Sequence, residues 1–143
     1  MSEVRFEGVT PYLYYEDANA ALDWLATVLG FREIVRYVDD AGAVQEASMA
    51  VGDHEIHLTG LGTGHWERLG TTGPVGQLNI VYVDDVDAHY KRASAAGAVA
   101  DPPVDKPYGA RAYLVTDPGG NSWCLWQHIP RRGDMPGLRE IRA

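Results

Sequence analysis

The fold of this 143-residue chain is decided by residues 9–31, VTPYLYYEDANAALDWLATVLGF. The stretch begins with an apolar, tyrosine-rich run typical of a strand, and alanine and leucine residues at helical spacing follow it. Asp17 stands where a helix N-cap belongs, and Gly30 stands where a helix ends. The stretch therefore predicts a strand that leads directly into a helix.

The same pattern returns in residues 78–98, LNIVYVDDVDAHYKRASAAGA. Asp17 matches Asp85 at an offset of 68 residues, whereas Gly30 matches Gly97 at an offset of 67, so the second copy is one residue shorter. Three strand-like runs follow each helix, at 31–38, 44–51 and 54–60 and then at 98–104, 110–116 and 122–128. We therefore predict an α+β fold of two βαβββ modules, a pair of curved mixed sheets with helices on their outer faces.

The repeat divides the chain into four segments. We expect one domain over residues 1–143, in which the first module covers about 9–60 and the second about 77–129. The connection at about 61–76 is rich in glycine, which favours a flexible linker; the alternative is a rim over a cavity, with His65 and Trp66 as contact residues. The last segment, 130–143, is a basic tail.

Charge and composition exclude several classes of partner. The net charge is −8, and because the tail carries +2, residues 1–129 carry −10, which repels nucleic acid. A single cysteine allows no intrachain disulfide, and no apolar run is long enough to suggest a membrane span. The first residues do not resemble a signal peptide. We expect a cytoplasmic protein without nucleic-acid or membrane partners.

Both halves of the chain resemble one protein family. The segments VTPYLYYEDANAALDWLATVLGF, YVDDVDAHYKRASAAGA and PYGARAYLVTDPGGNSW are similar to the vicinal oxygen chelate superfamily, which includes glyoxalase I, extradiol dioxygenases and bleomycin-resistance proteins. The likeness is strongest to the glyoxalase and bleomycin-resistance group, whose members are often of unassigned activity. It implies paired βαβββ modules, a cup-shaped cavity formed by the concave sheets, and frequently a homodimer. The same scaffold supports several chemistries, so fold alone does not decide function.

The resemblance also implies where a divalent metal would bind. Enzymes of the superfamily use His and Glu ligands from the first and last strand of each module, and these positions correspond here to Thr10, His57, Leu78 and Cys124. A slip of one residue would replace Leu78 by Gln77. Only His57 and Cys124 are competent ligands, and a catalytic site ordinarily needs about three. We predict no metal and no cofactor, with a rearranged site that recruits Glu55 or His128 as the alternative.

Three titratable side chains have competing interpretations. Cys124 stands where the family pattern places Glu, and inert packing is favoured over a thiolate activated by His57 or a simple ligand contact. His57 is either a hydrogen-bonded binding residue or a general base, the one catalytic candidate. His89 falls on the second predicted helix, where we expect surface exposure or packing.

The motif from residue 107 to 123 contributes one charged candidate and one turn. Arg111 either binds an anionic group at the cavity mouth or forms a structural ion pair. Asp117 and Asn121 are expected to build the turn through side-chain to backbone hydrogen bonds, and Gly119 and Gly120 to supply positive φ angles. We therefore give the turn a structural role.

Strand alternation places several aromatic side chains on the inward faces, and an aromatic cup with a few polar groups suits a flat or amphipathic organic molecule. The alternative is that these side chains pack a dimer or the core between the modules. The predicted ligand-binding residues are Tyr12, Tyr14, His57, Arg111, Cys124 and Trp126.

These observations lead to three functional hypotheses. The first is a metal-independent protein of the glyoxalase and bleomycin-resistance type that binds and sequesters an aromatic or amphipathic small molecule. The second is an enzyme, either a glyoxalase-like lyase or isomerase or a dioxygenase-like enzyme with a divergent metal site, or a metal-free catalyst with His57 as base. The third is a structural or regulatory dimer whose cavity is closed by packing. The expected partners are a small organic ligand and a second copy of the chain.

Overall fold

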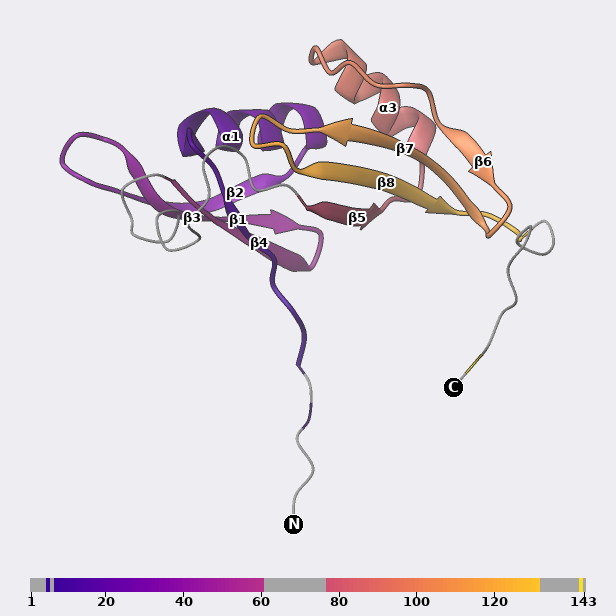
Figure 1. Cartoon of the computed structure of the whole chain (residues 1–143), viewed down its shortest axis with the longest axis horizontal. Coiled ribbons are helices and arrows are strands. Elements are labelled where there is room, and N and C mark those ends of the chain that lie inside the picture. Colours follow the sequence, from indigo (N-terminus) through magenta and orange to yellow (C-terminus); the bar gives the residue numbers. More distant parts are fainter. Residues whose placement is uncertain (1–4, 6, 61–76, 132–141, 143) are drawn as a thin grey trace.

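The computed structural model describes residues 5, 7–60, 77–131 and 142, and it contains two four-stranded mixed sheets with helices on one side of both (Figure 1). The predicted α+β fold of two βαβββ modules is confirmed. The connection at 61–76, with His65 and Trp66, and most of the basic tail lie outside the described residues. No helix in the described ranges is both long and apolar enough to cross a membrane.

The first module follows the predicted order of elements. Asp17 caps α1 through a hydrogen bond that Ala20 N donates to its carboxylate at 3.0 Å. The helix then continues as a π-helix, η1, which ends at Gly30 with a φ of 82°. The sheet order is β1-β4-β3-β2, with β1 parallel to β4. The elements are β1 (Tyr12–Tyr14), α1 (Ala18–Trp24), η1 (Leu25–Leu29), β2 (Arg32–Val38), β3 (Val44–Val51) and β4 (His54–Thr59).

The second module repeats this order with one difference in a strand. Asp85 caps its helix by accepting a hydrogen bond from Ala88 N at 3.0 Å. The strand predicted at 98–104 lies instead at the end of that range and beyond it, because Pro102 and Pro103 have no N–H to donate to a ladder. The elements are β5 (Leu78–Tyr82), α3 (Val86–Ala95), β6 (Val104–Lys106), β7 (Ala110–Thr116) and β8 (Ser122–His128), in the sheet order β5-β8-β7-β6.

Strand pairing shows that the sequence repeat is a structural repeat. Tyr12 pairs with His57 across β1 and β4, and Ile80 pairs with Cys124 across β5 and β8. Ile80 follows Tyr12 by 68 residues and Cys124 follows His57 by 67, the same two offsets as the helix signals. The extra residue of the first copy therefore falls between β1 and β4, in the segment that contains η1.

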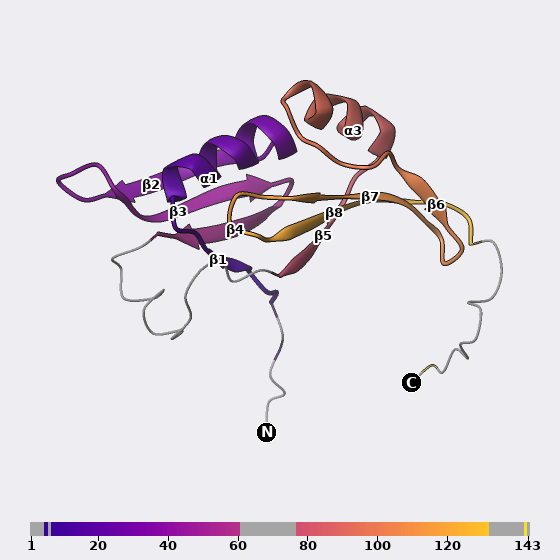
Figure 2. The same cartoon turned by 45° about the horizontal axis from the view of Figure 1, so that its top comes forward.

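The core lies between the helices and the sheets. Figure 2 shows the arrangement of these helices and sheets from a second direction. Alternate residues of the strands, such as Leu13, Leu58 and Leu125, are almost fully buried on the side that carries the helices. Burial of each such leucine contributes about 1.5–3 kcal/mol to the free energy of folding. The opposite face of each sheet, here named the helix-free face, is left for other contacts.

The turn after β7 joins the two modules. Asp117 is buried and accepts hydrogen bonds from Gly119 N and Asn121 N at 2.9 Å, which confirms its predicted turn-building role. It also accepts from Tyr15 of the first module at 2.6 Å and from Trp123 Nε1 at 2.9 Å. Gly119 allows the close approach, since a Cβ there would lie 2.5 Å from the Tyr15 ring. Of the two predicted glycines, Gly120 supplies the positive φ, 85°.

His89 forms a second link between the modules. Its Nε2 lies 3.0 Å from the carbonyl oxygen of Leu29, and its Nδ1 lies 2.6 Å from the hydroxyl of Tyr113. A carbonyl only accepts hydrogen bonds, so Nε2 carries a proton, and in the neutral imidazole Nδ1 accepts from the tyrosine hydroxyl. The neutral imidazole therefore satisfies both contacts, and His89 is a half-buried hydrogen-bonding residue rather than a surface one.

Protonation of His89 should therefore destabilise the fold. Burial, the larger cause, and the nearby charge of Arg92 lower the pKa of His89 despite the opposing effect of its bond to Leu29. The unfolded chain thus takes up a proton first as the pH falls, so stability is fully present above the ordinary value of about 6.5 and is lost on acidification below it. We expect urea midpoints to fall more steeply between about pH 7 and pH 5 in the native protein than in His89→Gln. Equal slopes would show that His89 is not responsible.

Candidate functional site

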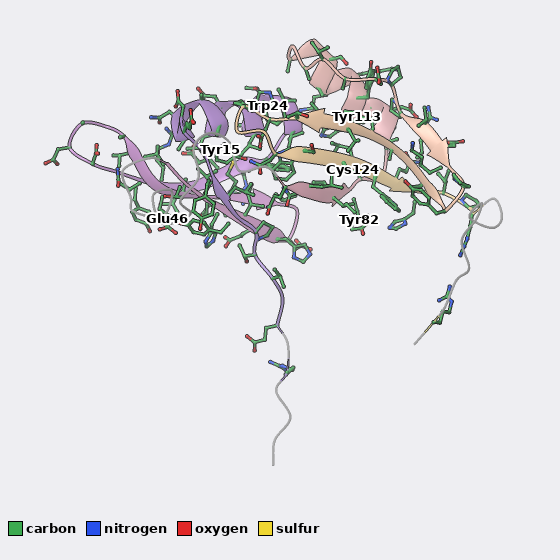
Figure 3. All side chains as sticks on the ribbon, in the orientation of Figure 1. Tyr15, Trp24, Glu46, Tyr82, Tyr113 and Cys124 are labelled. Atoms are coloured by element: carbon green, nitrogen blue, oxygen red, sulfur yellow. The ribbon has the colours of Figure 1, made fainter. Side chains whose placement is uncertain are left out.

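The helix-free faces carry most of the predicted ligand-binding side chains. In the first sheet, Tyr12, Tyr14 and His57 lie on this face, because they alternate with the buried Leu13 and Leu58. Figure 3 shows Glu46 and Tyr82 on the side of the sheets away from the helices. In the second sheet this face presents large apolar groups to solvent: the exposed fraction is 60% for Leu78, 45% for Ile80 and 62% for Tyr82.

One cavity lies on the helix-free face of the second sheet. Its volume is about 480 Å³, and every residue that lines it belongs to the second module. Ala112 and Cys124 are small side chains at its floor, with Leu114 and Trp126 beside them on the neighbouring ladder positions. We name it the second-sheet cavity; it is lined by Leu78, Ile80, Asp101, Pro102, Val104, Lys106, Tyr108, Ala112, Tyr113, Leu114, Cys124 and Trp126.

Trp126 is the centre of an aromatic cluster at this cavity. Its ring centroid lies 5.4 Å from that of Tyr108, 6.1 Å from that of Tyr82 and 6.2 Å from that of His128. His128 in turn stacks on Tyr82, with an interplanar angle of 8°. The indole N–H of Trp126 is enclosed and has no hydrogen-bond partner in the described part of the chain. The cluster supplies a flat surface and one unused donor.

The environment of Cys124 favours a protonated thiol. Burial, the dominant effect, raises the pKa of Cys124, and the positive charge of Lys106 offsets only part of that increase. The thiolate is the reactive form, so this environment does not activate a nucleophile. The side chain therefore contributes shape to the cavity wall.

His57 lies apart from Cys124, on the first sheet. Its Nε2 is 3.5 Å from a carboxylate oxygen of Glu55, and its ring is 6.4 Å from that of Tyr12. Both side chains of the His57–Glu55 pair are well exposed, at 36% and 50%. No residue of the first sheet lines the second-sheet cavity, so the predicted inward positions occupy two separate surfaces within one chain.

Arg111 does not reach either of these surfaces. It lies on the helix side of β7, where its guanidinium donates to both carboxylate oxygens of Asp87 at 2.9 and 3.1 Å and to Asp105 at 3.0 Å. Those hydrogen bonds are also the main reason that the pKa of Arg111 is raised. The ion-pair alternative is the one observed, and we leave Arg111 out of the candidate site because both of its donor edges are occupied.

The residues at the family's metal positions do not fit a divalent ion. Thr10 lies on the exposed segment before β1, and Leu78 has no donor atom. Cys124 lies on the second sheet, whereas His57 lies on the first. In the described ranges, no group of three or more His, Cys, Asp and Glu side chains is placed to hold a metal ion. His57 and Cys124 are the two competent ligands among these four positions, which is too few for a catalytic site.

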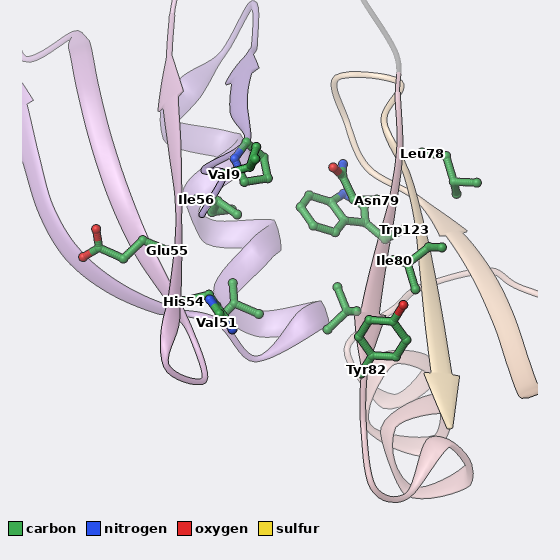
Figure 4. A pocket seen from close by; sticks show the side chains of 12 residues that line it. Val9, Val51, His54, Glu55, Ile56, Leu78, Asn79, Ile80, Tyr82 and Trp123 are labelled. Atoms are coloured by element: carbon green, nitrogen blue, oxygen red, sulfur yellow. The ribbon is translucent and has the colours of Figure 1, made fainter. Parts of the chain in front are cut away.

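A second cavity separates the two modules. It lies between β4 and β5 and has a volume of about 670 Å³ (Figure 4). Val9, Val51 and Ile56 line it from the first module, and Trp123 and Ile80 line it from the second. Its lining is mostly apolar, with His54, Glu55 and Asn79 as the polar residues. Of the predicted metal positions and their alternatives, Leu78 and Glu55 line it.

Sequence reasoning missed most of the second-sheet cavity. Lys106, Tyr108, Ala112 and Leu114 come from β6, β7 and the turn between them. The inward-facing residues were predicted on the first and last strand of each module, and Arg111 was the one candidate from β7. Alternation along β7 was the available signal, because Ala112 and Leu114 share a face. The exposed Leu114 on that face marks it as a site for contacts.

Comparison with known proteins places this architecture in a family. TioX from Micromonospora sp. ML1 is 34% identical and matches with a TM-score of 0.67, over 87% of this chain and 98% of its own. TnmS3, an antibiotic binding protein from Streptomyces sp. CB03234, is 24% identical with a TM-score of 0.69, over 88% of this chain and 99% of its own. The uncharacterized protein Rv0887c of Mycobacterium tuberculosis is 28% identical over 129 residues, 85% of this chain and 74% of its own. A family model matches residues 6–125, and the chain therefore belongs to the Glyoxalase/Bleomycin resistance protein/Dioxygenase superfamily.

Proposed function

We propose that this protein binds and sequesters an aromatic or amphipathic small molecule without using a metal ion. The observation that carries the proposal is the second-sheet cavity, an apolar hollow of about 480 Å³ beside the aromatic cluster of Trp126. Cavities of this size, lined by apolar and aromatic groups, are typical of small-molecule sites. TnmS3, which shares the fold, is an antibiotic binding protein, and that fact supports the choice of compounds to test.

The donor set supports the metal-independent form of the proposal. Thr10 and Leu78 stand at positions where the family's enzymes use His and Glu ligands, and Cys124 lies on a different sheet from His57. Binding energy would then come from burial of ligand surface against aromatic rings, which needs no ion. His57, Tyr12 and Tyr14 lie on the first sheet and do not line this cavity, so they would contact its ligand only where a second copy brings its first sheet over the cavity.

A ligand screen on chelator-treated protein tests this function. We expect some aromatic antibiotics or aromatic metabolites to raise the melting temperature, because a ligand that binds only the folded state stabilises it. The shift should be the same with and without added divalent ions. A shift that disappears on chelation and returns with a divalent ion would overturn metal independence. A collapsed cavity, together with the failure of every compound to bind, would overturn the sequestering function.

One observation favours a second candidate function. The His57–Glu55 pair, at 3.5 Å, places a carboxylate where it could orient an imidazole, an arrangement suited to a general base. We propose metal-free proton transfer by His57 as this alternative. This alternative requires that the protein converts a bound compound, and that His57→Ala abolishes the conversion while the melting temperature and the ligand affinity stay unchanged. Binding without conversion would contradict the alternative and would agree with the sequestering function.

The helix-free faces also support a homodimer. Leu78, Ile80, Tyr82 and Leu114 form a largely apolar exposed surface on the second sheet, and surfaces of this kind commonly mark interfaces. We propose that a second copy covers this surface and closes the binding site. Light scattering on the protein as it elutes from a size-exclusion column should give the mass of two chains. The mass of one chain at all concentrations would contradict the dimer.

A further inference from the structure

The polar groups of the second-sheet cavity are mostly hydrogen-bond donors. Trp126, whose indole N–H has no hydrogen-bond partner, and Lys106, which has no ion-pair partner among the described residues, both line it. The carboxylate of Asp101 also lines the cavity, from the exposed connection between α3 and β6. A bound molecule would therefore meet unused donors beside the aromatic rings and an acceptor at the rim.

Lys106 faces the interior of the cavity. It pairs with Ala110 across β6 and β7, and Ala110 pairs with His128 across β7 and β8, which places Lys106 on the same face as Trp126. Its charge is close enough to affect the titration of the Cys124 thiol. The neighbouring carboxylate of Asp105 is bound by Arg111 on the opposite face, so it does not neutralise Lys106.

Trp126 provides the second donor, an indole N–H that is enclosed by the surrounding side chains. An enclosed N–H without an acceptor is unfavourable, because the hydrogen bond that it made to water in the unfolded chain has not been replaced. A ligand oxygen that reaches the N–H would restore that bond. Tyr108, whose ring lies 5.4 Å away in the exposed turn between β6 and β7, is the neighbour that would move to admit it.

We propose that the second-sheet cavity selects planar aromatic compounds that carry an anionic oxygen, with the ring against Trp126 and Tyr108 and the oxygen toward Lys106. This proposal rests on the proposed binding function and adds to it a preferred charge of the ligand. The net charge of the protein is −8, which over long range favours cations. A preference for an anion would therefore have to come from the local donors.

Three compounds with one ring system and different charges test the preference. Isothermal titration of the full chain with 2-naphthoate, 2-naphthamide and 2-naphthylmethylammonium compares an anion, a neutral analogue and a cation. We expect 2-naphthoate to bind about tenfold more tightly than the amide, and the ammonium compound to bind most weakly. Equal affinities, a preference for the ammonium compound, or no binding of any of the three would overturn the proposal.

Variants identify the donor that is responsible. Lys106→Gln should weaken 2-naphthoate about tenfold and change the amide less than about twofold, since only the anion loses a charge partner. Lys91→Gln, on the exposed surface of α3, is the matched control and should change neither affinity. Trp126→Phe should weaken both compounds, because both present an oxygen to the lost N–H. An equal effect of Lys106→Gln on both compounds, or no effect on either, would overturn the assignment.

Failure of this inference can be separated from failure of the proposed function. If compounds from the thermal screen still bind and Cys124→Phe blocks them, the cavity is a binding site with a different charge preference. If the naphthalene compounds and the screened compounds all fail to bind, the sequestering function itself is wrong. Both outcomes are measured on the same purified protein, with the same binding assays.

Discussion

Asp117→Ala is expected to destabilise the protein by about 4 kcal/mol, because it leaves several buried donors without an acceptor. The carboxylate accepts from Tyr15, Trp123, Gly119 and Asn121, and the residue is almost completely buried. Each unsatisfied buried donor costs about 1–3 kcal/mol. Because Tyr15 belongs to the first module and the other donors to the second, the loss should affect the whole fold. Urea unfolding with circular dichroism would measure it.

Two variants show whether the loss of stability comes from this hydrogen-bond network or from a general sensitivity of the protein to substitution. Tyr15→Phe removes one hydrogen bond to a charged group and leaves the other donors in place, so we expect a smaller loss of about 2 kcal/mol. Asp53→Ala makes the same substitution at an exposed turn position and should stay within about 0.5 kcal/mol of the native protein. A loss below about 1 kcal/mol for Asp117→Ala would contradict the assigned role of the network.

Cys124→Phe is expected to weaken the binding of 2-naphthoate at least about tenfold, since the larger side chain would occupy the floor of the second-sheet cavity. The thiol is half-buried on the helix-free face, so the added ring would extend into the hollow rather than into the core. Some overpacking is expected as well, at about 1–3 kcal/mol. Titration calorimetry gives the affinity, and urea unfolding shows whether the variant still folds.

Cys124→Ser is the matched control for the thiol itself. It keeps the size of the side chain, and we expect affinity to change less than about twofold, because the wall is used for its shape. Unchanged binding in Cys124→Phe would show that the compound binds elsewhere, for example in the cavity between β4 and β5. Loss of binding in Cys124→Ser alone would indicate a specific role for sulfur.

The fold could be predicted because its signals are local and occur twice. Asp17 and Asp85 both cap helices as expected, and the two repeat offsets appear again in the pairs Tyr12–His57 and Ile80–Cys124. The predicted position of β6 was wrong, because the strand begins only after the prolines at 102 and 103. Signals that depend on a residue's own backbone preference or on alternation were therefore reliable.

The site was only partly predictable because it depends on contacts between distant segments. Alternation correctly assigned Trp126 and Cys124 to one face, but no local pattern shows that Lys106 lies over them. Likewise, Arg111 has the same sequence signal whether it meets a ligand or the carboxylate of Asp87, and only tertiary packing distinguishes the two. The link from Tyr15 to Asp117, 102 residues apart, was invisible for the same reason.

The π-helix η1 explains how the two copies of the module can differ in length and still form equivalent sheets. A π-turn accommodates one residue more than the corresponding α-turn, and the first copy has one residue more than the second between its N-cap and its terminal glycine. The wider turn thus accommodates the extra residue, and the strand pairs Tyr12–His57 and Ile80–Cys124 remain equivalent in the two modules. A difference of one residue within the helix therefore leaves the sheets unchanged.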